Sequence, residues 1–438
     1  MPKYNRPTTE AEFRANFLQK KPLMNDTEAN YGSAKCLFCY DAPCVKACPT
    51  GIDIPLFIKQ ISTRNIKGAA KTIFTANWLG NSCGIVCPTG VLCEGACVYN
   101  EQDIVPVEIG RLQNYATNYA ISSDIEIFSA GKTNGRKVAV IGAGPAGIAC
   151  ACELRTMGYE VDIFEAKEKP SGLNVHGIAP YKITNEEALA EVEYLQRYLG
   201  FRIYYRSPIT TKEQLSELEQ KYDAIFLGVG LGITAPLRID GEDKKGVVGA
   251  VEFVEELREH RHNLSVGHRV VVIGGGNTAM DAASEAARMG ADQVTLVYRR
   301  DKASMGAYGF EYDLAISAEV DSIFNAAPVA IIGDGSVSGV KFIKTKIVDG
   351  RVKIVEGSEF TIDCDMVIKA TGQAKQGHLY QLIDNLSLDA KGRIVVDKET
   401  FQTSNPRYFA GGDAVNGGAE VVNAAYHGKM AARGIDQT

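Results

Sequence analysis

The sequence predicts an α/β protein in which a helical, cysteine-rich domain is followed by two domains with parallel sheets. Three observations support this prediction. Eight of the 11 cysteines lie between Cys36 and Cys97. A strand–glycine turn–helix–strand unit begins at Lys137, and a second such unit begins at Val270, about 130 residues later. Two such units are expected when one chain carries two nucleotide-binding domains.

The composition limits the class of protein. The chain has 438 residues and a net charge of −6, which disfavours general nucleic-acid binding. No apolar run reaches the roughly 18 residues of a membrane span, and residues 1–20 lack an apolar signal core, so we expect a cytoplasmic protein without membrane contact. An odd number of clustered cysteines without an export signal favours metal or redox chemistry over a disulfide framework.

The first 130 residues are expected to be helical. Apolar residues recur at helical spacing over Pro55–Ile61 and Gly68–Thr75. The polar stretch Gly131–Arg136 is typical of a linker, so a domain boundary is predicted there.

The first glycine-rich turn has the residues of a dinucleotide fingerprint. The predicted strand Val138–Ile141 leads into the turn, and an apolar helix and a strand ending at Phe164 follow it. Glu165, at the end of that second strand, has the place of a carboxylate that accepts hydrogen bonds from a ribose. The candidate phosphate-binding residues are Gly142, Ala143, Gly144, Pro145, Ala146 and Gly147. A tight turn without a ligand is the alternative.

The second unit repeats the pattern with one difference. Its turn comprises Gly274, Gly275, Gly276, Asn277, Thr278 and Ala279, and its second strand, Gln293–Tyr298, ends at two arginines. Guanidinium groups bind a 2′-phosphate, whereas a carboxylate at this place would repel it. Arg299 and Arg300 therefore favour NADPH over NADH. A solvated basic pair is the alternative.

The rest of the chain is expected to complete both domains. A β-rich stretch follows residue 320, with strands over Val340–Lys346, Arg351–Val355 and Met366–Ala370. We predict that the second unit is inserted in the first domain, whose sheet resumes near 366. The predicted domains are 1–130, helical; 131–250 with 366–438, FAD-binding; and 251–365, NAD(P)-binding.

Two further motifs resemble those of flavoproteins with two dinucleotide domains. Gly411-Gly412-Asp413 resembles their second FAD motif, in which the aspartate contacts the ribityl chain and the following helix, here including Val421, points its N-terminus at the flavin ring. Ala370-Thr371-Gly372 resembles their turn at a strand end.

The cysteine block has the spacing of iron–sulfur ligands. Its first half is Cys36-x2-Cys39-x4-Cys44-x3-Cys48-Pro49, and its second is Cys83-x3-Cys87-Pro88-x5-Cys93-x3-Cys97. In two-cluster ferredoxins the cysteine before proline binds the other cluster, so sequence neighbours need not share one. Structural zinc also takes four thiolates, but it usually shows two CxxC knuckles, and only Cys36-Cys39 has that spacing.

Several segments resemble the N-terminal half of dihydropyrimidine dehydrogenase. These are Cys36–Cys44, Gly68–Phe74, Leu79–Thr89 and Ile109–Gln113. The resemblance covers essentially the whole chain and extends, less closely, to the small subunit of glutamate synthase. Gln113 separates the two, since glutamate synthase is expected to have an acidic residue in that helix.

The resemblance implies a complete set of site residues. One [4Fe–4S] cluster would be bound by Cys36, Cys39, Cys44 and Cys97, and the other by Cys48, Cys87, Cys93 and Gln113, with Cys83 left over. FAD would contact the Gly142–Gly147 turn, Glu165, Leu173, Lys182, Gly412, Asp413 and Val421. The nicotinamide nucleotide would contact Gly274–Thr278, Arg299, Arg300 and Ala370–Gly372.

The chain departs from the family pattern at two places. The usual Gly-Gly-Leu is Ser171-Gly172-Leu173, and a further basic residue expected near Gly306 is missing. The second departure weakens the preference for NADPH, and the bacterial form of the enzyme is NAD-linked.

The resemblance implies an electron-input subunit of bacterial dihydropyrimidine dehydrogenase. The long form of the enzyme continues into an FMN-binding barrel, for which the remaining residues of this sequence leave no room, so pyrimidine reduction is expected on a partner subunit that holds FMN and iron–sulfur clusters, in a hetero-oligomer. Hydride transfer needs no side-chain acid or base, and His176 and His427 are expected to make ordinary polar contacts. The alternatives are a glutamate-synthase-type small subunit, another NAD(P)H-dependent electron-supplying subunit, including a bifurcating one, a nucleotide-sensing scaffold and a zinc adapter.

Overall fold

The computed structural model describes residues 3–261 and 264–438, and the chain forms two compact units. We call Lys20–Val175, Lys182–Leu231 and Lys375–Thr438 the larger unit. Residues 3–19, His176–Tyr181 and Gly232–Ala374 form the smaller unit.

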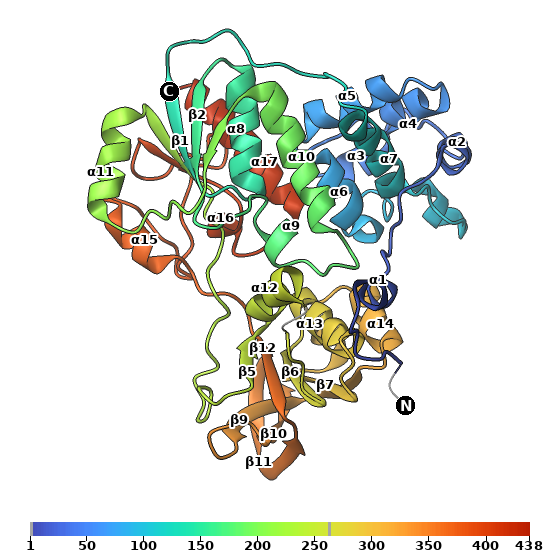
Figure 1. Ribbon diagram of the computed structural model, residues 1–438, viewed down its shortest axis with the longest axis vertical. Coiled ribbons are helices and arrows are strands. Elements are labelled where there is room, and N and C mark those ends of the chain that lie inside the picture. The colour runs from blue at the N-terminus through green and yellow to red at the C-terminus, as the bar shows by residue number, and fades with distance from the viewer. Residues whose placement is uncertain (1–2, 262–263) are drawn as a thin grey trace. The chain divides into compact units, whose positions relative to one another are not determined.

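Helices make up the N-terminal part of the larger unit (Figure 1). Asp53 and Asn65 accept hydrogen bonds from the first turns of two of them, which fixes where these helices begin. Phe57, Ile58 and Leu112 are fully buried in their shared core. The helices are α2 (Asp26–Ala34), α3 (Pro43–Ala47), α4 (Ile54–Ser62), α5 (Ile66–Ala76), α6 (Gly80–Val86) and α7 (Ile109–Ser122).

The remainder of the larger unit contains a five-stranded parallel sheet of order β13-β4-β1-β2-β3. Its central strands are buried apolar runs, as expected for a parallel sheet covered on both faces. The strands are β1 (Lys137–Ile141), β2 (Glu160–Phe164), β3 (Arg202–Tyr204), β4 (Ala224–Leu227) and β13 (Tyr408–Ala410). Its helices are α8 (Pro145–Thr156), α9 (Leu173–His176, of which His176 lies in the smaller unit), α10 (Asn185–Leu199), α11 (Lys212–Lys221), α15 (Gly377–Leu382), α16 (Asp413–Asn416) and α17 (Val421–Asp436).

Helices α8 and α17 pack closely against each other (Figure 1). A Cβ atom at Gly428 would lie 2.0 Å from the carbonyl oxygen of Ala146, so only glycine permits this approach. The packing brings the end of the chain beside the first glycine-rich turn.

Buried polar contacts join the helical part to the sheet of the larger unit. Glu191 of α10 accepts hydrogen bonds from the backbone nitrogens of Asn81 (2.6 Å) and Ser82 (3.1 Å) and thereby caps α6. The Lys429 ammonium of α17 donates to the carbonyl oxygen of Ala76 (3.1 Å), at the C-terminus of α5. Two helices of the cysteine-rich part are therefore held by charged side chains of the sheet part.

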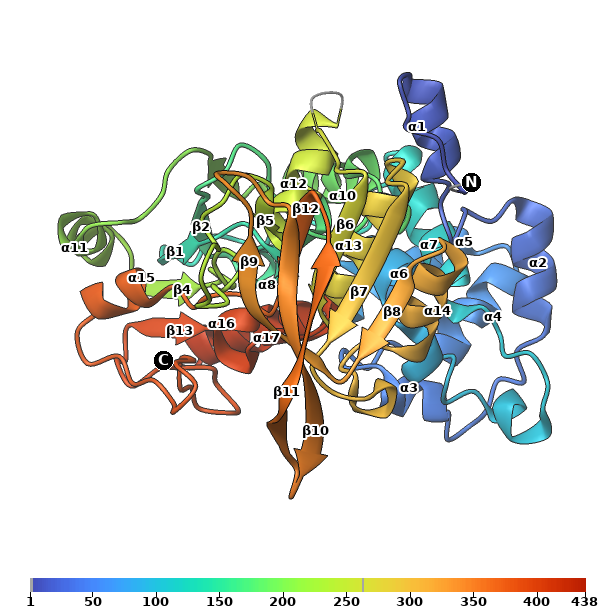
Figure 2. The same ribbon diagram turned by 90° about the horizontal axis from the view of Figure 1, so that it is seen from below.

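The smaller unit has its own five-stranded parallel sheet, of order β5-β12-β6-β7-β8 (Figure 2). The strands are β5 (Val247–Gly249), β6 (Arg269–Gly274), β7 (Gln293–Tyr298), β8 (Asp321–Phe324) and β12 (Met366–Ala370), and the helices are α12 (Ala250–His260), α13 (Asn277–Arg288) and α14 (Gly309–Ser317). A second, antiparallel sheet has the order β11-β10-β9 and comprises β9 (Ala326–Ile332), β10 (Gly339–Val348) and β11 (Arg351–Asp363).

The N-terminal segment packs on the smaller unit. Its helix α1 (Glu10–Asn16) begins at a capping box on Thr9. The Phe17 ring stacks on Phe13, with ring centroids 4.4 Å apart, and Asn16 donates a hydrogen bond to the carbonyl of Arg288 (2.7 Å). Residues 3–19 thus lie outside the helical domain that was predicted to begin at residue 1.

The predicted insertion of one domain in the other is confirmed, but the predicted boundaries are displaced. Strand β12 pairs in register with β6, from Met366 beside Val270 to Ala370 beside Gly274, so it belongs to the second sheet and not to the first. The smaller unit also extends back to Gly232 and includes β5. A buried apolar strand suits either sheet, which is why its sequence did not reveal its partner.

Candidate functional site

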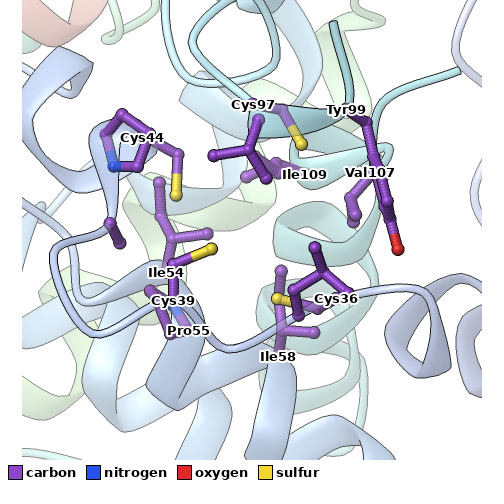
Figure 3. Close-up of a pocket in the computed structure, with 14 residues that line it drawn as sticks. Cys36, Cys39, Cys44, Ile54, Pro55, Ile58, Cys97, Tyr99, Val107 and Ile109 are labelled. Atoms are coloured by element: carbon purple, nitrogen blue, oxygen red, sulfur yellow. The ribbon is translucent and has the colours of Figure 1, made fainter. Parts of the chain in front are cut away.

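Four cysteines from both halves of the cysteine block line one pocket. Cys36 and Cys39 lie in the loop after α2, Cys44 lies on α3, and Cys97 precedes a short 3₁₀ helix. Their sulfur atoms lie around a common space with apolar walls that include Ile54 and Ile109 (Figure 3).

Burial makes the thiols of Cys36 and Cys44 poor anions on their own. It raises the pKa of Cys36, and together with the neighbouring Cys36 it raises the pKa of Cys44 to about 11. Four thiolates in one apolar pocket therefore need a cation among them, and an iron–sulfur core supplies it. The donor set fits such a group.

The second pocket combines cysteines with an amide. It is lined by Cys48, Cys83, Cys87, Cys93 and Gln113. The Gln113 amide nitrogen donates to the carbonyl oxygen of Gly80 (2.6 Å), which leaves the side-chain oxygen as the atom that this amide offers to the pocket. Cys83 was predicted to be left over. It lies in this pocket with the predicted ligands. It also forms a hydrogen bond with Cys87, and this bond, more than burial, raises the pKa of Cys87.

The two pockets contain the two sets that the resemblance implied. Cys97 lies in one pocket with cysteines of the first half of the block, and Cys48 lies in the other with cysteines of the second half. The second pocket is also lined by Val422 of α17, whereas the first is lined only by residues between 36 and 109.

The first glycine-rich turn lies between β1 and α8. Gly142 has a φ of +99°, and a Cβ atom there would lie 2.6 Å from the carbonyl oxygen of Gly228. The Glu165 carboxylate accepts a hydrogen bond from the backbone nitrogen of Ala143 (2.7 Å), so it lies at the turn as a ribose-binding acid should. The turn residues Ala143, Gly144, Pro145, Ala146 and Gly147 follow in order to the start of α8.

The second flavin motif lies at the start of α16. Gly412 has a φ of +67°, and burial raises the pKa of Asp413. His427 of α17 accepts a hydrogen bond at Nδ1 from the backbone nitrogen of Gly412 (3.2 Å), and burial lowers the pKa of His427. Of the other predicted residues, Val421 begins α17 and Leu173 begins α9, while Lys182 directly follows the segment His176–Tyr181.

The second glycine-rich turn lies at the carboxyl end of β6. A Cβ atom at Gly276 would find no atom of the described chain within 4 Å, so packing does not explain this glycine, whereas room for a ligand does. The carbonyl oxygen of Ala370 would lie 2.4 Å from a Cβ atom at Gly274, which places the turn Ala370–Gly372, including Thr371, beside it. The Asn277 side chain accepts from the backbone nitrogen of Tyr308 (3.0 Å), so Asn277 and Thr278 would offer a ligand their backbone at the start of α13.

Arg299 and Arg300 directly follow β7. Arg299 is exposed, and within the described part of the chain neither guanidinium pairs with a carboxylate. Two guanidinium groups that are not engaged by carboxylates can bind the 2′-phosphate of a nucleotide.

Three polar contacts have partners that the sequence did not indicate. His176 lies with Nδ1 3.5 Å from Glu255 and 3.3 Å from Glu259, both on α12. Glu191 and Lys429 hold the helices of the cysteine-rich part, as described above. Each pair of partners is far apart in the chain, so no local pattern indicates the contact. Cys150 and Cys152 are fully buried on α8, where they are part of the hydrophobic core of the larger unit.

Comparisons with known proteins agree with this arrangement. The family model of pyridine nucleotide-disulphide oxidoreductases matches residues 136–428, and that of dihydropyrimidine dehydrogenase domain II with its 4Fe-4S cluster matches residues 13–125. No helix among the described residues has the length and apolarity needed to span a membrane.

Similar proteins of known name include two from Escherichia coli K12. The small chain of NADPH-dependent glutamate synthase is 34% identical over 96% of this chain and 94% of its own. The NAD-dependent dihydropyrimidine dehydrogenase subunit PreT is 33% identical over 96% of this chain and 97% of its own. Among solved structures, Mycobacterium tuberculosis FprA with NADPH has a TM-score of 0.57 at 20% identity, over 69% of this chain and 85% of its own, which supports the fold.

Proposed function

Because the chain belongs to the pyridine nucleotide-disulphide oxidoreductase family and carries an N-terminal 4Fe-4S domain, it is an electron-transfer subunit, and we propose that it oxidises NAD(P)H to supply a pyrimidine-reducing partner. The partner would hold FMN and would reduce uracil or thymine to the 5,6-dihydropyrimidine. The observation that carries the proposal is the second pocket, in which three predicted cysteine ligands lie with Gln113 and not with an acidic residue.

The residues described above divide among the groups that the family uses. The first pocket would hold one [4Fe–4S] cluster through Cys36, Cys39, Cys44 and Cys97, and the second would hold another through Cys48, Cys87, Cys93 and Gln113. When bound, FAD takes a hydride from NAD(P)H, and the clusters carry the electrons away singly.

The protein's own part is to bind and orient. The Gly142–Gly147 turn and the start of α8 direct backbone N–H groups at a pyrophosphate, and Glu165 accepts from a ribose. The second pocket shares α17 with the second flavin motif, because Val422 lines it, whereas the first has no lining residue from that part of the chain. We therefore propose that the second pocket lies on the flavin side and the first on the partner side.

The nucleotide is proposed to be NADPH, with NADH as the other candidate. Arg299 and Arg300 at the end of β7, which pair with no carboxylate among residues 3–261 and 264–438, support a 2′-phosphate. The PreT relatives, by contrast, are named as NAD-dependent.

A glutamate-synthase-type small subunit is the second candidate function. Its support is the 34% identity to the Escherichia coli small chain. The two candidates predict different partners, namely an FMN protein that reduces pyrimidines or a large chain that hydrolyses glutamine.

Isolation of the natural partner distinguishes these candidates. The tagged chain is purified anaerobically from its source cells, and the complex is assayed with uracil, thymine and both nicotinamide nucleotides. We expect NAD(P)H-dependent formation of dihydropyrimidine. Glutamate formation from glutamine and 2-oxoglutarate without pyrimidine reduction would refute the proposed partner while leaving the electron-transfer role intact.

A further inference from the structure

A chain of hydrogen bonds connects the segments around the second pocket. The Lys21 ammonium donates to the carbonyl oxygen of Cys87 (3.1 Å) and to the hydroxyl of Thr89 (3.1 Å). That hydroxyl donates to one carboxylate oxygen of Glu94 (2.8 Å). The other oxygen of Glu94 accepts from the backbone nitrogen of Gly110 (2.9 Å), in the first turn of α7.

The segments that these hydrogen bonds connect each carry a predicted ligand of the second pocket. Cys87 ends α6 and accepts directly from Lys21, Cys93 precedes Glu94, and Gln113 lies one turn beyond Gly110 on α7. Thr89 is buried, so the bridge runs through the interior and not through solvent. Partners of this kind, which hold ligands without touching the metal, fix ligand geometry.

The cation in this network lies beside the pocket. Reduction adds one negative charge to a cluster, and a nearby ammonium stabilises the added charge by Coulomb attraction. Glu94 directly follows Cys93, and its carboxylate accepts from the Thr89 hydroxyl and from the Gly110 backbone nitrogen, which partly offset its negative charge.

We propose that Lys21, Thr89 and Glu94 are positioning residues for the second cluster and that Lys21 raises the reduction potential of that cluster. The inference rests on the proposed function, since it requires a cluster in this pocket. It adds residues outside the ligand set, all of them in the larger unit.

The test is a redox titration of each cluster by electron paramagnetic resonance, with iron analysis, in holoprotein reconstituted anaerobically. Lys21→Met removes the charge, Lys21→Arg keeps it, and Lys71→Met removes an exposed lysine of α5 outside the network. At a fixed potential near the midpoint, we expect Lys21→Met to lower the ratio of reduced to oxidised second cluster about tenfold, equivalent to about 59 mV for one electron. The ratio for the first cluster is expected to stay at its wild-type value in every variant. In Lys21→Arg and Lys71→Met, the ratio for the second cluster is also expected to stay at its wild-type value.

Thr89→Val tests the positioning role independently. It removes the bridging hydroxyl at nearly constant volume, and we expect faster loss of iron from the second pocket to a chelator, with the first pocket unchanged. Selective loss of the second cluster in Lys21→Met would also support the proposal. Wild-type behaviour of both clusters in both variants, or equal changes in the two clusters, would overturn it. A wild-type protein without iron would instead refute the proposed function.

Discussion

Ser171 adopts a left-handed backbone conformation that usually favours glycine. Its φ is +78°, it is fully buried, and its nitrogen donates to the carbonyl oxygen of Ala143 (2.7 Å) in the first glycine-rich turn. The Ser171 hydroxyl accepts from Asn174 (3.2 Å), which gives the serine a contact that glycine lacks. Serine in place of the first glycine of Gly-Gly-Leu thus adds the hydrogen bond with Asn174 and keeps the backbone contact with the first glycine-rich turn.

Two substitutions separate these effects. Ser171→Gly and Ser171→Ala both lose the hydroxyl, but only alanine keeps a Cβ atom in the left-handed region. We expect the free energy of unfolding of Ser171→Ala to lie about 1 kcal/mol below that of Ser171→Gly. Urea midpoints of the two variants measure the difference. Equal midpoints would show that the turn relaxes around the side chain.

A second single-residue substitution, at Arg299, tests the preference for NADPH over NADH. Arg299→Ala removes a guanidinium that pairs with no carboxylate in the described part of the chain, and a charged hydrogen bond is worth about 1.5–3 kcal/mol. We therefore expect the KM for NADPH to rise at least about tenfold and the KM for NADH to change little. Arg351→Ala, at the exposed start of β11, is the control. Equal effects on both nucleotides would refute the preference for NADPH.

At the scale of elements, Glu191 makes the attachment of α6 to α10 depend on pH. Burial raises the pKa of Glu191 to about 7, although the bonds from Ser82 and Asn81 oppose the rise. Since the pKa is higher in the folded than in the unfolded protein, the contribution of Glu191 to stability is full below about pH 4.5 and is lost as pH rises through about 7.

Glu191→Gln removes this titration and keeps an oxygen to accept from the backbone of α6. Between pH 5 and pH 8 we expect the urea midpoint of the wild type to fall relative to that of Glu191→Gln. Glu193→Gln, which changes an exposed carboxylate on the same helix, should follow the wild type. If the difference between wild type and Glu191→Gln stays constant with pH, Glu191 is ionised throughout.

The elements also show what the sequence could predict. The strand Gln293–Tyr298 has the predicted bounds, and β2 ends at Phe164 as predicted, because apolar and β-branched residues in each stop at a charged residue, Arg299 or Glu165. The sheet to which Met366–Ala370 belongs was mispredicted, since pairing is set by distant strands. The contacts of Lys21, Glu191 and Lys429 likewise join distant segments and leave no local pattern.

At the scale of the whole molecule, the chain brings sites for a nucleotide, a flavin and two sets of sulfur ligands into one polypeptide. The ligand sets followed from the family resemblance, and the pockets contain the residues it implied. The i, i+4 spacing of Cys83 and Cys87 at the end of α6 indicates that the two lie side by side, but the family resemblance assigned the fourth ligand position to Gln113 and left Cys83 without a role.

The central claim is that this chain carries electrons from NAD(P)H through bound FAD and two iron–sulfur clusters. Its most direct test is iron and flavin analysis of anaerobically isolated protein, followed by stopped-flow mixing with NAD(P)H. The account predicts about eight irons and one FAD per chain, from two four-iron clusters, and rapid bleaching of the flavin. Far fewer irons, no bound flavin, or a flavin that NAD(P)H does not bleach would contradict it.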